Sequence, residues 1–287
     1  MLEQRVAHNP GKVFNYSGGL SMLLAYLIER ETEMGAAAFA KRYLFEPLGI
    51  SDYEWRNLTG GLIDFPGGLS MRPRDMAKIG QLCLNGGRWN GEVIVSKDWV
   101  TESTREHIIN VDSPNYGFQW WCGKFYYRDR SVYLYMASGH GGQKIFVVPD
   151  FNLVVVITHQ DFDNPAGEAH NTAIMSRYIL PALDPCKPRE VPVKLDVETL
   201  SRFVGAYASS NGKFKIDIHN GRLKVTTQNT EPMYLVPISR TRFRGTVQDL
   251  IDVEFVFDIT DDGKVQGGRA SYVFTKDSFV RVLNSSK

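Results

Sequence analysis

The chain has 287 residues, 43% hydrophobic and 12% aromatic, which is enough for one large domain with a buried core and a small second one. With 33 basic against 32 acidic residues and no long basic run, nucleic acid is not an expected partner. The longest apolar segment, at 20–28, is far shorter than the roughly 20 residues of a bilayer span, so no membrane span is expected. No signal peptide is visible, and the cellular compartment stays open.

The first part of the chain predicts helices. Apolar residues recur at helical spacing over 20–28, which predicts a helix whose apolar face turns toward the core. Further helices are expected over 36–44 and 73–82. Ser96 is the predicted N-cap of a fourth helix.

From residue 116 onward the pattern changes to the alternation typical of strands. The predicted strands are 116–121, 132–136, 144–148 and 153–158. A hairpin is expected at 149–152, and a closing helix at 169–183. These elements indicate an α+β arrangement with an antiparallel sheet, in which the strand 153–158 is almost wholly apolar.

A proline-rich segment at 185–194 predicts a stiff, extended linker, so domains are expected at 1–184 and 195–287. In the second domain, apolar and polar residues alternate over 214–218 and 253–259, and Asn220-Gly221 supplies a two-residue hairpin turn. This domain is predicted to be a small antiparallel β-meander or barrel.

Two groups of residues, the cysteines and a polar loop, are candidates for metal-binding sites, but the pattern of neither predicts one. The three cysteines lack metal-ligand spacing and indicate buried reduced thiols. The polar loop at 159–170 carries His159, Asp161, Asp163, Glu168 and His170, but such a loop is typical of solvated surface, so no metal is assigned. No cofactor is expected either. Core packing is the favoured use of the aromatic residues at 120–127, with an aromatic substrate cleft as the alternative.

Four segments carry a likeness to a known family: FNYSGG at 14–19, FEPLGI at 45–50, GQLCLNGGRWNG at 80–91 and SGHGGQ at 138–143. Together they resemble the serine β-lactamase-related family, which holds class C β-lactamases, D-alanyl-D-alanine peptidases, esterases and 6-aminohexanoate-dimer hydrolases. The resemblance runs over about 9–183. It implies a fold like that of β-lactamases and penicillin-binding proteins, an antiparallel sheet with helices, and hydrolysis of a small-molecule amide or ester. In that fold, strands of an N-terminal segment pair beside the strand before the closing helix. The resemblance therefore also implies that the strand at 153–158 is an open edge here, which favours self-association.

The family's chemistry needs a nucleophilic serine with a lysine one helical turn later, upstream of the tyrosine motif. This chain has no such pair there. Ser210 and Lys213 have the spacing, but their surroundings predict a hairpin turn. The resemblance therefore leaves two expectations: an N-terminally truncated serine hydrolase that is inactive or incomplete as this chain, or a non-catalytic binding module that retains the cleft.

Tyr16 matches the family's tyrosine, whose phenol relays a proton between the nucleophile and the leaving group. The alternative is a loop tyrosine that packs on the following helix. Gly18 stands where many relatives have an asparagine that contacts the substrate amide. Its presence puts β-lactam recognition in doubt and leaves smaller amides or esters.

His140 occupies the position of the lysine in the family's Lys-Thr-Gly strand motif, and histidine can donate a hydrogen bond or carry charge beside the tyrosine. Gly142 would let the substrate backbone approach the strand edge, and the Gln143 amide would be an oxyanion-hole donor. The alternative is a glycine-rich hairpin with a surface histidine. If the resemblance holds, Tyr16 and His140 line one cleft within about 8 Å of each other.

Overall fold

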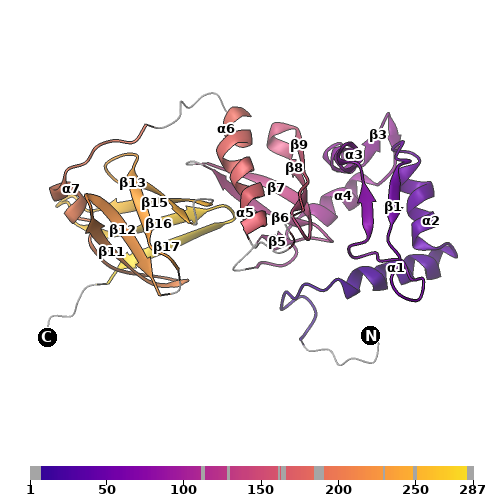
Figure 1. Ribbon diagram of the computed structural model, residues 1–287, viewed down its shortest axis with the longest axis horizontal. Coiled ribbons are helices and arrows are strands. Elements are labelled where there is room, and N and C mark those ends of the chain that lie inside the picture. The colour runs from indigo at the N-terminus through magenta and orange to yellow at the C-terminus, as the bar shows by residue number, and fades with distance from the viewer. Residues whose placement is uncertain are drawn as a thin grey trace. The chain divides into compact units, whose positions relative to one another are not determined.

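A computed structural model describes residues 8–110, 114–127, 130–160, 162, 166–183, 191–228, 230–247 and 251–282. The chain splits into two compact units (Figure 1). The sheet unit comprises Met1–Gly123 and Tyr133–Asn164, and the barrel unit comprises Lys124–Val132 and Pro165–Lys287. The expected linker lies partly outside the described residues, and the domain boundaries stay a prediction.

The helices of the sheet unit form where the sequence predicts them. They are α1 Gly19–Thr32, α2 Ala36–Ala40 with its π-helical continuation η1 Lys41–Phe45, α3 Pro73–Leu84 and α4 Lys97–Thr104. Pro73 lies in the first turn of α3, where its missing N–H breaks no helical hydrogen bond. The Ser96 hydroxyl accepts a hydrogen bond from the Trp99 N–H at 3.2 Å, which confirms the predicted N-cap of α4.

The apolar face of α1 is largely exposed, contrary to expectation. Leu20, Leu24 and Leu27 are 48%, 45% and 39% exposed, Leu23 and Ile28 are half-buried, and Ala25 is buried. Hydrophobic periodicity identifies an apolar face but not the element that covers it. The prediction of a helix is therefore confirmed, and the prediction of its burial is wrong.

A five-stranded sheet forms the centre of the sheet unit. Its order is β5 Asn115–Tyr116, β6 Trp121–Tyr127, β7 Arg130–Gly139, β8 Gln143–Val148 and β9 Leu153–Ile157. Two small antiparallel pairs accompany it, β1 Tyr53–Trp55 with β2 Leu69–Met71 and β3 Arg88–Trp89 with β4 Glu92–Val93. The hairpin between β8 and β9 is confirmed, with Asn152 in the left-handed conformation that closes it.

The segment 116–121, expected as one strand, is broken into the end of β5 and the start of β6. Gln119 between them has a φ of 64°, which reverses the chain direction. The reversal brings the rings of Tyr116 and Trp121 to 4.8 Å. Favourable ring packing across the bend outweighs the strand propensity of the aromatic residues, so the expectation of a single strand is wrong.

Helix α3 packs directly on β8 and β9. The contact is close because Gly80 has no side chain: a Cβ there would lie 2.7 Å from Val154 Cγ1 and 2.9 Å from Ile145 Cγ2. Cys122, Tyr135, Ile145 and Val147 form the buried core on this face of the sheet. The helix therefore fixes the sheet at the strands that follow the candidate site residues.

The barrel unit contains a closed antiparallel barrel, as predicted for the C-terminal region. Its strands are β10 Gly205–Ser209, β11 Gly212–His219, β12 Arg222–Thr227, β13 Met233–Pro237, β14 Arg242–Val247, β15 Ile251–Ile259, β16 Val265–Tyr272 and β17 Thr275–Arg281. The predicted Asn220-Gly221 turn joins β11 to β12, where His219 pairs with Arg222. A short helix, α7 Val197–Ser201, precedes the barrel.

The closing helix forms as α5 Ala166–Ile174, η3 Met175–Ile179 and α6 Leu180–Leu183. By packing it belongs to the barrel unit, because Arg177 binds Asp252 of β15 through Nη2 to Oδ1 at 2.9 Å and Nε to Oδ2 at 3.2 Å. No helix in the described part of the chain is long and apolar enough to cross a membrane. The predicted fold class, a mixed sheet and helix region plus an all-β region, is confirmed.

Candidate active site

Tyr16 lies in the loop before α1 and packs on the sheet through its ring. It stacks on Trp121 at 5.6 Å with an interplanar angle of 29°, and meets the edge of Tyr116 at 6.2 Å. Phe14 contacts the same two rings. Because Tyr16 is still 54% exposed, its hydroxyl can reach a ligand while its ring is held in place.

The neighbouring phenol, that of Tyr116, has a raised pKa. Burial, and secondarily the proximity of Tyr16, raises the pKa of Tyr116 to about 12. Tyr116 therefore stays protonated throughout the physiological range. It supports the Tyr16 ring through packing, and it adds no negative charge to the site.

Gly18 precedes α1 and lies against Pro66. A Cβ on Gly18 would be 3.2 Å from the Cβ of Pro66, so a larger residue would have to displace that proline. The first turn of α1 is tied to the bend before β6, since the Ser21 hydroxyl donates to Gln119 Oε1 at 3.3 Å. The tyrosine loop is therefore held from two sides.

The turn between β7 and β8 requires glycine at two successive positions. Gly141 and Gly142 have φ of 84° and 95°, which side chains rarely adopt. A Cβ on Gly141 would lie 2.4 Å from the ring of Phe162, and one on Gly142 would lie 2.2 Å from the ring of His159. The segment after β9 thus packs tightly on this turn and fixes its backbone.

His140 and Gln143 flank these glycines. The exposed His140 ring lies 5.6 Å from the ring of Phe162. Gln143 Oε1 is buried and accepts no hydrogen bond from the described residues. A buried acceptor in that state costs about 1–3 kcal/mol, which a donor from a ligand or another segment would recover. Backbone and side chain of Gln143 are both candidates for substrate contact.

Sequence reasoning missed a buried lysine beside this turn. Lys144 is 3% exposed, and its ammonium donates to the Ser138 hydroxyl on the paired position of β7. A lone lysine within the apolar strand Gln143–Val148 was the available signal, because a buried cation in a strand needs partners. His159 and Phe162 were also missed as packing partners, since their role depends on contacts distant in sequence.

The strand order places these residues at one end of the sheet. Tyr116 at the end of β5 pairs with Trp121 at the start of β6, and Gly139 at the end of β7 pairs with Gln143 at the start of β8. Strands β6 and β7 are neighbours separated by two residues, so they run antiparallel, and the start of β6 lies at the same end as the end of β7. The separation of the Tyr16 phenol from the His140 imidazole stays a prediction.

The other candidate groups take structural roles or lie outside the described residues. Phe125 and Tyr127 are buried, which confirms core packing for them, whereas Trp121 supports Tyr16. Asp161 and Asp163 lie outside the described residues, as does the side chain of Glu168. Within the described ranges, no group of three His, Cys, Asp or Glu side chains is arranged to hold a metal ion.

A model of the Beta-lactamase family matches residues 1–178, more than half of the chain. The chain belongs to the Beta-lactamase family. It is 28% identical over 120 residues to a 6-aminohexanoate-dimer hydrolase of Paenarthrobacter ureafaciens, a match that covers 38% of this chain and 31% of that enzyme. The likeness to serine β-lactamase relatives expected from the motifs is thereby confirmed.

Solved structures of family members share the fold. A Bacillus anthracis protein assigned as a 6-aminohexanoate-dimer hydrolase superposes with a TM-score of 0.53 at 23% identity, over 63% of this chain and 46% of that one. The octameric penicillin-binding protein homologue from Pyrococcus abyssi gives a TM-score of 0.50 at 17% identity, over 96% of this chain and 66% of its own. The chain spans about a third of the curated relative and about half of the first solved structure.

Proposed function

We propose that this family member carries the tyrosine and histidine part of an acyl-transfer site for small amide or ester bonds. The observation that supports it is the common sheet end of the Tyr16 loop and the glycine turn at 139–142, both held by tight packing. Two prearranged polar segments facing one end of a sheet suit a reaction in which proton transfer and oxyanion stabilisation act on one carbonyl.

Each residue has a distinct role in this proposal. The Tyr16 phenol relays the proton between nucleophile and leaving group. His140 donates a hydrogen bond beside it, and the Gln143 amide stabilises the developing oxyanion. The Gly142 N–H donates to the Gly139 carbonyl at 3.2 Å and so closes the turn. The rings of Phe162 and His159 occupy the space that a Cβ on Gly141 or Gly142 would take, so the role expected of Gly142, to let the substrate approach the strand edge, is not supported on that side of the turn.

The nucleophile is the part that this sequence does not supply in the usual form. The one Ser-x-x-Lys of the chain, Ser210 to Lys213, spans the turn between β10 and β11, where Ser209 pairs with Gly212. The Ser210 hydroxyl donates to Asp277 Oδ1 at 2.9 Å, and no helix brings the lysine back to it. We therefore propose that the chain by itself has little covalent turnover.

A linear amide is the proposed substrate class. The curated relative is named for the 6-aminohexanoate dimer, a linear amide. Gly18 lacks the side chain that contacts a substrate amide in many relatives, and Pro66 fills the space beside it. A small, unbranched acyl group suits a site with fewer side-chain contacts better than a rigid bicyclic β-lactam does.

The turnover experiment compares the chain with its Tyr16→Phe variant on nitrocefin and p-nitrophenyl butyrate. We expect equal, near-background rates and no stoichiometric labelling by a fluorophosphonate, because a proton relay without a nucleophile leaves little rate enhancement. Robust turnover that disappears in Tyr16→Phe, or full labelling, would show that another serine acts as the nucleophile.

Binding tests the site itself. Calorimetry with the linear 6-aminohexanoate dimer should give weaker binding to Tyr16→Phe and His140→Ala, by about 3- to 10-fold each, since each removes one hydrogen bond. Tyr26→Phe is the matched control, because Tyr26 is 56% exposed on α1 and has no assigned role. Unchanged affinity in both site variants would contradict the assignment.

The second candidate function is a binding module without chemistry. The placement of the only Ser-x-x-Lys in a barrel turn favours it. Both candidates predict ligand binding, and neither predicts labelling of this chain without a suitable serine. Stoichiometric fluorophosphonate labelling would therefore exclude the binding module, whereas its absence fits both.

A further inference from the structure

A pocket of about 760 Å³ lies in the sheet unit, away from the candidate site. It is formed by the C-terminal end of α3, the β3 and β4 pair, one face of α4, and Tyr133 and Tyr135 of β7. Tyr133 and Tyr135 line it from β7, whereas the candidate site begins at Gly139 of the same strand. At about 3.3 Å per residue, Tyr133 lies roughly 20 Å along the strand from Gly139.

The charge in this pocket is of one sign. Arg88, Lys97 and Arg105 line it, and no Asp or Glu belongs to the described lining. Glu102 nearby pairs with Arg105, with Nε to Oε2 at 2.7 Å and Nη2 to Oε1 at 2.5 Å, which offsets that one cation. Arg88 and Lys97 remain, so the pocket favours an anion.

Both remaining cations are held in position. The Arg88 guanidinium donates through Nη2 to the Gly91 carbonyl at 2.6 Å, which leaves further N–H groups for a ligand. The stem of Lys97 lies against Gly86, since a Cβ there would be 3.4 Å from Lys97 Cγ. Asn85, which also lines the pocket, accepts a hydrogen bond at its Oδ1 from the Gln81 side chain at 2.9 Å.

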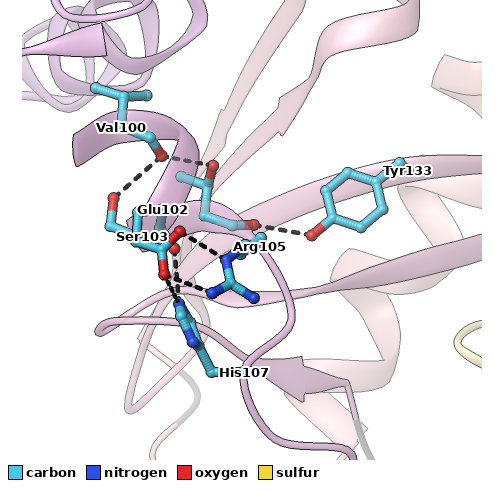
Figure 2. Close-up of polar contacts among 7 residues, drawn as sticks. Val100, Glu102, Ser103, Arg105, His107 and Tyr133 are labelled. Atoms are coloured by element: carbon cyan, nitrogen blue, oxygen red, sulfur yellow. Dashed lines mark hydrogen bonds and ion pairs between the residues drawn. The ribbon is translucent and has the colours of Figure 1, made fainter. Parts of the chain in front are cut away.

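The α4 wall of the pocket is fixed by hydrogen bonds (Figure 2). The Tyr133 hydroxyl donates to the Thr104 carbonyl at 2.8 Å, and the Thr104 hydroxyl donates to the Val100 carbonyl at 2.8 Å. Ser103 makes a further bond to Val100 at 3.2 Å. Burial raises the pKa of the Cys83 thiol to about 11 and also raises that of Tyr133, so neither adds negative charge at neutral pH.

Apolar groups complete the lining and suggest the shape of the occupant. Leu84, Val93, Val100 and Pro149 line the pocket together with the ring of Tyr135. A volume of this size and a mixture of a few fixed polar groups with apolar surface are typical of small-molecule sites. A purely inorganic anion would leave this apolar surface uncovered.

We propose that this pocket binds a small organic anion, with its carboxylate or phosphate held by Arg88 and Lys97 and its apolar body against Tyr135 and Pro149. The ligand is a monoanion or dianion with a flat ring or short alkyl group. Binding here does not use Tyr16 or His140, so this proposal can be tested independently of the proposed hydrolase site.

The experiment is calorimetry of the whole chain with phenyl phosphate, benzoate, inorganic phosphate and benzyl alcohol. Phenyl phosphate or benzoate should bind saturably and at least about 5-fold more tightly than inorganic phosphate, and benzyl alcohol should not bind, because both the charge and the ring are needed. The better of the two aryl anions identifies the head group. Raising the ionic strength should weaken binding.

Variants locate the site. Lys97→Gln and Arg88→Gln should each weaken aryl-anion binding about 3- to 10-fold, and the double variant should abolish it, while Tyr16→Phe leaves it unchanged. Lys213→Gln is the matched control, an exposed lysine in the barrel unit. The proposal is overturned if neither aryl anion binds at about 10 mM. It is equally overturned if benzyl alcohol binds as well as the anions, or if the double variant keeps its affinity.

Discussion

The barrel and the central sheet differ in whether they have edge strands. In the barrel, β10 pairs with both β11 and β17, so every strand has two neighbours. In the sheet, β9 is the last strand of the order, and each of its five residues is only half-buried. Every barrel strand is paired on both sides. Among the described residues, β9 is paired only with β8, although Val154 and Val156 pack against the core beside α3, so its other backbone edge is available to another segment or chain.

The candidate site lies in the sheet unit, which contains the open edge. The barrel core consists of aromatic rings that pack on one another, while the sheet unit exposes α1 leucines and carries Tyr16 and His140. The closed unit therefore carries the aromatic core, and the unit with the open edge carries the candidate site residues. All five tryptophans lie in the sheet unit, so tryptophan fluorescence follows its unfolding alone.

The largest expected effect is in the barrel core. Phe257 is 3% exposed and its ring lies 4.8 Å from Phe203 and 5.4 Å from Phe279. Phe257→Ala should lower the free energy of unfolding by about 3–5 kcal/mol, measured by urea denaturation with far-UV circular dichroism. Tyr234→Ala, at a 41% exposed barrel position, should cost less than about 1 kcal/mol. Equal effects would mean that the barrel is not closed around this core.

The next effect concerns the glycine turn of the site. Gly142→Ala should destabilise the sheet unit by about 2–4 kcal/mol, because it adds backbone strain and a clash with His159. Gly60→Ala is matched, since Gly60 has a φ of 90° and nothing within 4 Å of an added Cβ, and should cost only about 1 kcal/mol. In a double-mutant cycle, the added cost of Gly142→Ala should fall in a His159→Ala background. A cost independent of residue 159 would contradict the packing described.

The open edge of β9 predicts that the chain self-associates. We expect its affinity for itself to be about tenfold higher than that of a variant with a charge on this edge. Light scattering should show concentration-dependent association, reduced by Val155→Lys in β9, because a charge on an edge strand opposes pairing with another chain. Val280→Lys is the control: Val280 is 63% exposed but its strand is paired on both sides. A stable monomer at high concentration, with amides 153–157 protected from hydrogen exchange, would show that this edge is already covered.

The smallest expected effect concerns the ionisation of the buried thiols, and it tests whether the sheet unit is well packed. Burial raises the pKa of Cys83 and of Cys122 to about 11, from a usual 9.0. The unfolded thiols ionise first as pH rises, so their contribution to stability is complete below pH 9 and is lost between pH 9 and 11. At pH 8, iodoacetamide should label Cys83 and Cys122, each followed by mass spectrometry of its peptide, about 100-fold more slowly in the native chain than in the urea-unfolded chain. Equal labelling rates would indicate a loosely packed sheet unit.

The two units also differ in how far the sequence predicts them. Alternation over 214–218 and 253–259 with the Asn220-Gly221 turn specifies barrel strands, because a closed antiparallel sheet needs only local patterning and short turns. In the sheet unit, periodicity locates α1 but not the exposure of its leucines. The bend at Gln119 is also unpredicted, since it depends on ring packing between residues on either side.

The candidate site shows the same limit. Motif likeness locates Tyr16 and His140, and the structure adds why the turn between β7 and β8 needs Gly141 and Gly142. The Lys144 bond to Ser138 depends on strand register, and the contact of His159 with Gly142 depends on where the chain returns after β9. Strand register depends on the conformation of the turn and on which face is buried, and the position of the chain after β9 depends on tertiary packing, so motif likeness alone predicts neither.

The central claim is that the Tyr16 loop and the β7–β8 turn form one site. The most direct measurement is a nitrogen–proton correlation spectrum titrated with the linear amide dimer, followed at the backbone amides 16–18 and 140–143. We expect both groups of resonances to shift with one dissociation constant, and His140→Ala to weaken the response of the 16–18 group as well. Shifts confined to one group, or two unrelated dissociation constants, would contradict it.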